Sequence, residues 1–295
     1  MADEGAKAIW EAQANADIAW LFEAEAFRVA PSDKPFWFTS GLIGPYFISA
    51  HYLCGGPGAA ESLLSFIDAH ADDARTFPAK LLAQLRALYA EHAIYKAVVD
   101  QLTALAAEVL PLSEVTHVAG GQRRDWFFAP MLAEKLEKPC LYIYNDLEIC
   151  SDEGEEVTSL RGANVVNVAD LLTVASSYTK KWVPAIEAKG GRLLWALNCV
   201  DRVQGGRENL AAVNITVCES LFEVSTGLFD SALERNLIDS GQHRMLCDFL
   251  ADPHASMRSF LVAHPEFLKE SLQSPDAKIR QRAELCQTEN LYHLD

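Results

Sequence analysis

The chain has 295 residues, 50% of them hydrophobic, and its 41 acidic against 25 basic residues give a net charge of −16. This composition predicts a soluble globular protein with a sizeable core. A surface this acidic repels phosphate backbones and anionic lipids, which argues against a nucleic-acid or membrane partner. The acidic N-terminus lacks the pattern of a signal peptide, and no apolar run approaches the ~20 residues of a membrane span, so we expect a cytoplasmic protein. Seven scattered cysteines predict reduced thiols.

The N-terminal third reads as helices around an aromatic segment. Residues 3–28 repeat apolar side chains at helical spacing and predict an amphipathic helix. The Pro- and Gly-punctuated segment 31–53 predicts a short strand pair. Two helices are expected next, at 58–72 and 78–109, the second with Pro78 in its first turn.

Beyond residue 110, short apolar runs alternate with helical patterns. The expected strands are 115–120, 140–145, 164–169, 192–200 and 214–220, and the helices between them are 125–137, 175–188 and 206–212. Because these runs are apolar on both faces, they predict an α/β fold with a mostly parallel sheet flanked by helices. Residues 221–295 are expected to be helical, with breaks near Gly241, Pro253 and Pro275.

The stretch 162–180, "GANVVNVADLLTVASSYTK", carries the first candidate site. Ligands of parallel sheets bind beyond the carboxyl ends of strands, where a helix start offers unpaired amides to an anion. Asp170 is suited to accept hydrogen bonds from sugar hydroxyls, while the hydroxyls of Thr173, Ser176 and Ser177 suit a phosphate. An ordinary capped helix would use the same residue types, so both interpretations stay open.

The stretch 120–126, "GGQRRDW", carries the second candidate site. Arg123 and Arg124 follow a glycine pair at an expected strand end, which makes a local anion site in an acidic chain. The alternative is that both arginines pair with surface carboxylates. The histidines are scattered, and His51 and His117 are expected to be core residues rather than catalytic ones.

Four segments together resemble a known family. The stretch 162–180 resembles the 5-phosphoribosyl-1-pyrophosphate (PRPP) motif of the type I phosphoribosyltransferases. The other three are similar to parts of the orotate phosphoribosyltransferases: 36–53 to their N-terminal hood, 118–139 to their pyrophosphate loop and following helix, and "VDR" (200–202) to an Asp-Arg pair. The resemblance covers about residues 15–222. It implies a type I phosphoribosyltransferase fold divided into N-terminal helices and hood (1–110), a core (111–222) and a helical extension packed on the core (223–295).

The resemblance also implies roles. We expect an orotate-phosphoribosyltransferase-like protein that binds PRPP or a nucleoside monophosphate as its small-molecule partner and forms a homodimer. If it is catalytic, it transfers phosphoribosyl to a nitrogen base with Mg²⁺ as cofactor, although no metal ligand can be assigned. The implied contacts are Asp170 for the ribose hydroxyls, Thr173, Val174, Ala175, Ser176 and Ser177 for the 5′-phosphate, Gly121, Gln122, Arg123 and Arg124 for pyrophosphate, and Phe47 and Arg202 for the base.

Several positions depart from the family pattern. Ala169 replaces the first of two acids in the PRPP motif, Ala175 replaces a glycine in the phosphate loop, and Asp125 replaces a glycine after Arg124. The segment 146–156 corresponds to a cationic mobile loop, yet it holds six acids and no Lys, Arg or His. Because cations stabilise the departing pyrophosphate, an acidic lid opposes transfer. The alternative function is therefore a non-catalytic nucleotide- or PRPP-binding regulatory module, and the loop itself is expected to be solvated if it meets no ligand.

Overall fold

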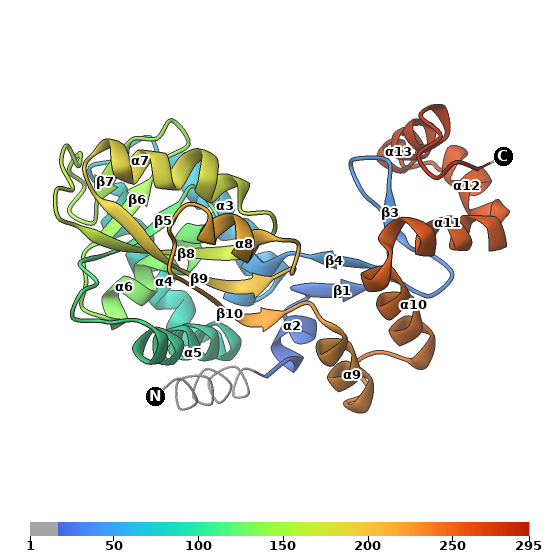
Figure 1. Ribbon diagram of the computed structural model, residues 1–295, viewed down its shortest axis with the longest axis horizontal. Helices are drawn as coiled ribbons and strands as arrows, with labels where there is room; N and C mark the ends of the chain where they lie inside the picture. Colours follow the sequence, from blue (N-terminus) through green and yellow to red (C-terminus); the bar gives the residue numbers. More distant parts are fainter. Residues whose placement is uncertain (1–16, 295) are drawn as a thin grey trace. The chain divides into compact units, whose positions relative to one another are not determined.

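The computed structural model describes residues 17–294 (Figure 1). These residues form two compact units. The sheet unit contains the residues up to Ala26 together with Ala50–Val224, and the helical unit contains Phe27–Ser49 together with the residues from Ser225 onward. This partition differs from the expected one, because the aromatic segment around residue 40 groups with the C-terminal helices rather than with the N-terminal ones.

The sheet unit is built on a six-stranded sheet in the order β10-β9-β8-β5-β6-β7. Its strands are β5 (His117–Gly121), β6 (Cys140–Ile143), β7 (Ile149–Ser151), β8 (Asn164–Leu172), β9 (Arg192–Asp201) and β10 (Val217–Glu223). All neighbouring strands pair in parallel except β7, which is antiparallel at the edge. The predicted mostly parallel α/β architecture is confirmed. The reason is that strands buried on both faces need apolar side chains at every position, which the sequence supplies.

Helices cover both faces of this sheet (Figure 1). They are α2 (Ala19–Glu23), η1 (Ala50–Cys54), α3 (Pro57–His70), α4 (Phe77–Glu91), α5 (Ala93–Val109), η2 (Asp125–Phe127), α6 (Ala129–Lys135), the π-helical η3 (Tyr178–Trp182), α7 (Val183–Ala188) and α8 (Gly206–Ala211). Ile186 of α7 and Leu210 of α8 share one core cluster with Val165 of β8. The other face carries Phe77 of α4, whose ring centroid lies 6.2 Å from that of Tyr142 in β6.

The helical unit holds two short strand pairs and five helices. Its elements are β1 (Phe27–Val29), β2 (Phe36–Trp37), β3 (Ile43–Gly44), β4 (Tyr46–Ile48), α9 (Thr226–Glu234), α10 (Ser240–Ala251), α11 (Pro253–Ala263), α12 (Pro265–Leu272) and α13 (Ala277–Thr288). Trp37 stacks on Phe267 with ring centroids 5.6 Å apart, and its indole N–H donates to Ser271 Oγ at 3.0 Å. The aromatic segment therefore finds its core among the C-terminal helices.

Some expected boundaries differ from the observed ones. The helix expected at 78–109 is two helices, because the backbone is extended at His92. Of the helix expected at 3–28, residues 3–16 lie outside the described residues, and Phe27–Val29 form β1 because they pair with β4. The break expected near Gly241 is confirmed, because α9 ends at Glu234 and α10 begins at Ser240, where the capping box of Asp239 and Gln242 stabilises the helix start.

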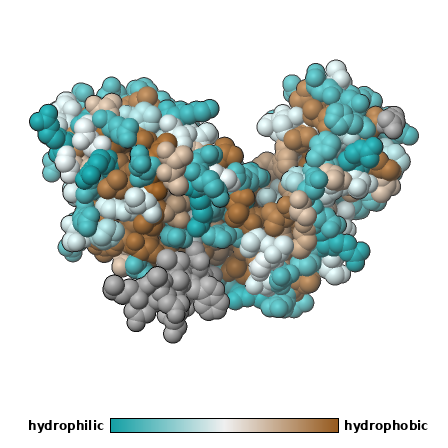
Figure 2. Space-filling view, viewed as in Figure 1, coloured by the Kyte–Doolittle hydropathy of each residue, from teal (hydrophilic) through white to brown (hydrophobic). Residues whose placement is uncertain are grey.

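The visible face in Figure 2 mixes hydrophilic residues with hydrophobic ones. All seven cysteines are free thiols, as predicted, and five of them are buried. None of the helices within residues 17–294 combines the length and apolar character needed to cross a bilayer.

Candidate functional site

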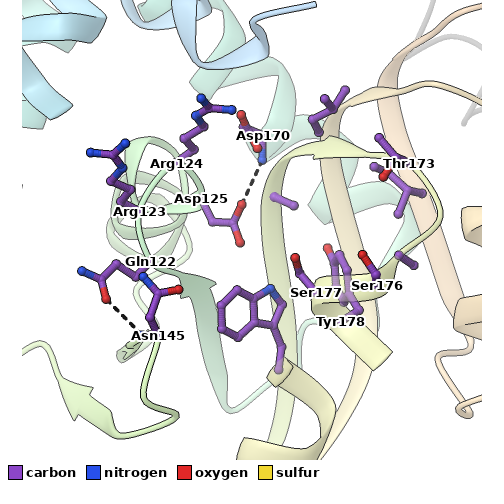
Figure 3. A pocket seen from close by; sticks show the side chains of 15 residues that line it. Gln122, Arg123, Arg124, Asp125, Asn145, Asp170, Thr173, Ser176, Ser177 and Tyr178 are labelled. Carbon is purple, nitrogen blue, oxygen red and sulfur yellow. Dashed lines mark hydrogen bonds between the residues drawn. The ribbon is translucent and has the colours of Figure 1, made fainter. Parts of the chain in front are cut away.

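A pocket of about 320 Å³ opens in the sheet unit where β5 and β8 end (Figure 3). Two segments supply most of its lining: Gln122–Asp125, which follows β5, and Ala169–Tyr178, which contains the end of β8 and the turn beyond it. Asn145, which follows β6, and Trp182 complete it. The carboxyl ends of neighbouring parallel strands meet at one edge of a sheet, so these two sequence-distant segments lie side by side.

The turn at residues 173–177 presents hydroxyls and main-chain amides. Ser176 and Ser177 are exposed at the start of the helix, and no hydrogen bond between described residues uses the amide of Ala175, Ser176 or Ser177 as donor. Ala175 adopts a φ of 56°, in the left-handed region that favours glycine. The turn thus keeps a glycine-type conformation despite the methyl group. The side chain of Asn209 in α8 steadies it by donating to the carbonyl of Val174 at 3.0 Å.

The loop after β5 brings two arginines to the opposite side of the pocket (Figure 3). Gly121 must lack a side chain because the Trp182 ring packs directly on it. The Gln122 side chain accepts a hydrogen bond from the Asn145 amide at 3.0 Å, which ties this loop to the end of β6. Arg123 forms an ion pair with Asp68 of α3. Arg124 is exposed, and among residues 17–294 no ion pair involves it, so its charge is available to an anion.

Two buried carboxylates lie between these two sides. Asp125 Oδ2 accepts from the Gly121 amide at 3.0 Å, and Asp125 Oδ1 accepts from the Asp170 amide at 3.4 Å. Only 9% of Asp125 and 8% of Asp170 are exposed. Burial raises the pKa of Asp125 well above its usual value, and the neighbouring charge of Asp170 raises it further. Burial also raises the pKa of Asp170 to about 6, opposed by the positive charge of Arg124.

His51 lies behind Asp170. Its Nδ1 is 3.8 Å from Asp170 Oδ2, and that nitrogen is buried without a hydrogen-bond partner. Burial lowers the pKa of His51 to about 4, and the charges of Arg124 and Arg123 add to this effect. At neutral pH the imidazole is therefore uncharged. It packs against aromatic rings, with the Phe127 centroid 5.8 Å away, as expected for a core histidine.

Known proteins share this fold. No family model matches the chain. The orotate phosphoribosyltransferase of Sulfolobus acidocaldarius is 30% identical over 123 residues, which are 42% of this chain and 61% of that protein. The Leishmania donovani UMP synthase structure has a TM-score of 0.52 at 16% identity, covering 83% of this chain and 42% of that one. The orotate phosphoribosyltransferase structure from Francisella tularensis has a TM-score of 0.50 at 13% identity, covering 79% of this chain and 96% of that one.

This is the type I phosphoribosyltransferase fold. The sequence similarity to an orotate phosphoribosyltransferase agrees with the resemblance found in the motifs. The chain matches about three fifths of the length of its curated relative and less than half of the UMP synthase chain.

Within this type I phosphoribosyltransferase fold, most predicted site residues lie around one pocket. Its lining includes Asp170, Thr173, Ala175, Ser176, Ser177, Gln122, Arg123 and Arg124. Gly121 and Val174 are each next to a lining residue in the sequence, but they do not line the pocket themselves. Arg202 follows β9 and donates its main-chain amide to the Leu172 carbonyl at 2.9 Å, outside the lining. Phe47 belongs to the helical unit, where its ring contacts those of Phe36 and Phe38.

The acidic segment 146–156 folds as a hairpin at the sheet edge. β7 within it pairs with β6, and Cys150 forms a further bridge with Glu156. Asp152 accepts a hydrogen bond from the Cys140 amide at 3.3 Å. None of the residues 146–156 lines the pocket. All six acidic residues of the segment are exposed, as expected for a solvated segment, but the backbone between them is ordered by its pairing with β6.

Sequence reasoning missed Asp125, Asn145, Tyr178 and Trp182 as pocket residues. For Asp125 a signal was available. The run Trp126–Phe128 that follows it is fully buried, so the chain turns into the core immediately after Asp125 and carries its carboxylate inward. Asn145 and Trp182 had no such signal, because only the tertiary fold brings them to the pocket.

Proposed function

We propose that this protein binds PRPP or a nucleoside monophosphate in the pocket between β5 and β8 and transfers phosphoribosyl to a nitrogen base. One observation carries the proposal: a single pocket joins an amide- and hydroxyl-lined turn, an arginine-bearing loop and a buried carboxylate. PRPP has the complementary parts, which are a phosphate, a diphosphate and the ribose hydroxyls between them.

Each residue has a role that follows from its chemistry. The amides at 175–177 and the hydroxyls of Ser176 and Ser177 hold the 5′-phosphate. Asp170 accepts hydrogen bonds from ribose hydroxyls and so orients the sugar. Arg124 faces the diphosphate. In the reaction the bond from ribose C1 to the diphosphate oxygen breaks and a bond from C1 to the base nitrogen forms, so negative charge collects on the diphosphate, where a fixed cation stabilises it.

Arg123 contributes to the same field in a weaker way. Its guanidinium already pairs with the partly exposed Asp68, so part of its charge is compensated. Arg124 has no such partner among the described residues and lies beside the carboxylate pair. We therefore assign Arg124 as the principal pyrophosphate-binding residue, with Gly121 and Gln122 shaping the loop that presents it.

The donor set fits a magnesium ion that arrives with the diphosphate. No group of three His, Cys, Asp or Glu side chains within residues 17–294 could hold a metal by itself. Mg²⁺ usually takes one or two carboxylates and completes its shell with water and substrate phosphates, and Asp125 and Asp170 are the carboxylates of this pocket. When bound, the ion supplies charge neutralisation on the leaving diphosphate.

The identity of the base rests on similarity. The 30% identity to the Sulfolobus acidocaldarius orotate phosphoribosyltransferase supports orotate as the first base to test. Arg202, in the sheet unit, is the proposed base contact. A homodimer and a cytoplasmic location belong to the same proposal, and light scattering on the purified chain tests the first of them.

The assay mixes the protein with PRPP, Mg²⁺ and a panel of bases that includes orotate, and follows pyrophosphate release. Calorimetric titrations of PRPP and nucleoside monophosphates run in parallel. Release with one base and not with the others supports transfer. Binding without release supports the non-catalytic module instead, and absence of binding by either ligand contradicts the proposal. The acidic hairpin does not line the pocket.

A further inference from the structure

A second carboxylate stands beside Asp170 in the pocket, and it comes from a different element. Asp125 begins η2, whereas Asp170 belongs to β8. Asp125 connects the two segments directly, because its Oδ1 accepts from the Asp170 amide and its Oδ2 accepts from the Gly121 amide. In Figure 3 Asp125 lies between the arginine loop and the serines of the opposite turn. The position next to Asp170 in sequence is Ala169, which lines the same pocket with a methyl group.

This arrangement is costly for the folded protein on its own. Two carboxylates are removed from water together, and the nearest histidine is uncharged at neutral pH. Burying like charges side by side destabilises a fold unless protons, cations or donors compensate. Holding the loop after β5 in place needs only acceptors for the amides of Gly121 and Asp170. An uncharged asparagine side chain would supply one such acceptor oxygen. The pocket therefore holds more acceptor capacity than its own backbone uses.

The unused capacity has a definite chemistry. Each carboxylate oxygen of Asp125 accepts one main-chain hydrogen bond, and a carboxylate oxygen has a second lone pair with which to accept another. Asp125 also lines the pocket. Two carboxylates from adjacent elements match two neighbouring hydroxyl donors. The flanking groups are an exposed arginine and a turn of free amides, so the same ligand carries an anion.

We propose that Asp125 is a ligand-binding residue that forms, with Asp170, a carboxylate pair for the vicinal hydroxyls of a phosphorylated pentose. This deepens the proposed function and rests on it. The pair is assembled across two strand ends and compensates for the alanine at 169. If Asp125 only supported the loop, Asp170 alone would set the preference for ribose over deoxyribose, and replacing Asp125 would leave that preference unchanged.

The test is calorimetry in EDTA at pH 7.5 with four ligands: inorganic phosphate, ribose 5-phosphate, 2-deoxyribose 5-phosphate and 3-deoxyribose 5-phosphate. The wild type is expected to prefer ribose 5-phosphate over at least one deoxy ligand by about tenfold, because a hydroxyl donating to a charged acceptor is lost. In Asp125→Asn this preference falls at least threefold; because it is a ratio between sugar phosphates, it is independent of any change in phosphate affinity that loss of the Asp125 charge causes. The matched control is Asp152→Asn, since Asp152 also accepts from a main-chain amide but lies outside the pocket; it keeps the wild-type preference.

The outcomes separate the inference from the function. If Asp125→Asn weakens all three sugar phosphates by the same factor, or changes none, Asp125 is only a brace and the inference is overturned. If the wild type binds phosphate and sugar phosphates without preference, the inference fails and the phosphate site stands. If the wild type binds none of them, the proposed function fails as well. Should Asp125→Asn not fold, a wild-type crystal soaked with ribose 5-phosphate decides: the Asp125 carboxylate lies within about 3.2 Å of a ribose hydroxyl, or the inference is overturned.

Discussion

Two neighbouring loops of the sheet unit have opposite charge and opposite roles. The loop after β5 carries Arg123 and Arg124 and lines the pocket. The segment after β6 carries six acids and turns back along the sheet as β7, contributing only Asn145, at its start, to the lining. Of these two loops, the acidic one carries more charged residues, yet none of its acids lines the pocket. The interaction between a charged residue and a ligand weakens with distance and is screened beyond ~8 Å at physiological salt. The position of a loop relative to the pocket therefore decides how strongly its charges affect ligand binding.

The largest expected effect on pyrophosphate binding comes from reversing the charge at Arg124. Arg124→Glu is expected to weaken pyrophosphate binding by more than about 100-fold, because it removes a charge-assisted contact and adds repulsion. Titration calorimetry with pyrophosphate measures the effect. Arg86→Glu serves as the control, since Arg86 is an exposed arginine paired with Glu134 away from the pocket. Equal losses in the two variants would mean that the pocket is not the anion site.

The next effect concerns Asp170, where binding and stability are expected to move in opposite directions. Asp170→Asn weakens ribose 5-phosphate binding about tenfold, since a charged acceptor is lost. The raised pKa means that the folded protein retains the Asp170 proton more strongly than the unfolded chain does. The contribution of Asp170 to wild-type stability therefore falls as pH rises from about 4 to about 6 and then levels off.

Asparagine cannot ionise, so at pH 7.5 the variant gains up to about 3 kcal/mol in free energy of unfolding. The gain disappears below pH 4, where Asp170 is protonated in both states. Urea unfolding of both proteins at pH 3.5, 5 and 7.5 measures it. A variant that is less stable than the wild type at pH 7.5 would show that the Asp170 carboxylate is compensated within the protein.

A smaller effect is expected at Ala175. Its φ of 56° costs an alanine about 1 kcal/mol relative to glycine, although glycine also gains entropy in the unfolded chain. Ala175→Gly should therefore change the free energy of unfolding by less than about 1 kcal/mol and phosphate affinity by less than about threefold. Thermal unfolding and phosphate titration measure the two quantities. A large loss of phosphate affinity would indicate that the methyl group itself shapes the turn.

The smallest effect is expected in the acidic hairpin. Replacing Glu153 and Glu155 together by glutamine should alter pyrophosphate affinity by less than about twofold at 0.15 M salt, because both carboxylates are outside the pocket lining. Calorimetry at 0.15 M and 0.02 M salt measures it. A gain of tenfold or more at the higher salt would place this hairpin over the bound ligand and reverse its role in the comparison.

The sequence predicted the fold well because its signals were local. Runs such as 164–169 are apolar on both faces, a pattern that indicates a parallel sheet, and the phosphate turn follows directly from hydroxyl residues after such a run. The strand itself extends to Leu172, so Asp170 lies inside β8 rather than beyond it. Its amide is satisfied by Asp125, a contact between segments 45 residues apart that no local pattern encodes.

Other features depended on tertiary partners. The break at His92 has no glycine or proline to announce it, and the association of the aromatic segment with the C-terminal helices arises from contacts such as Trp37 with Phe267. The acidic segment was predicted only in part. Its six acids are exposed, as their charge suggested, whereas the pairing of the short buried stretch Ile149–Cys150 with β6 depends on a tertiary partner.

The most direct test of the central claim is backbone amide NMR of the wild-type protein during titration with ribose 5-phosphate, with neutral ribose as the reference ligand. The account predicts that the amide resonances of Ala175, Ser176 and Ser177 shift with ribose 5-phosphate and not with ribose, while those of Asp152 and Glu153 stay in place. Unchanged resonances at 175–177 under saturating ribose 5-phosphate would contradict it.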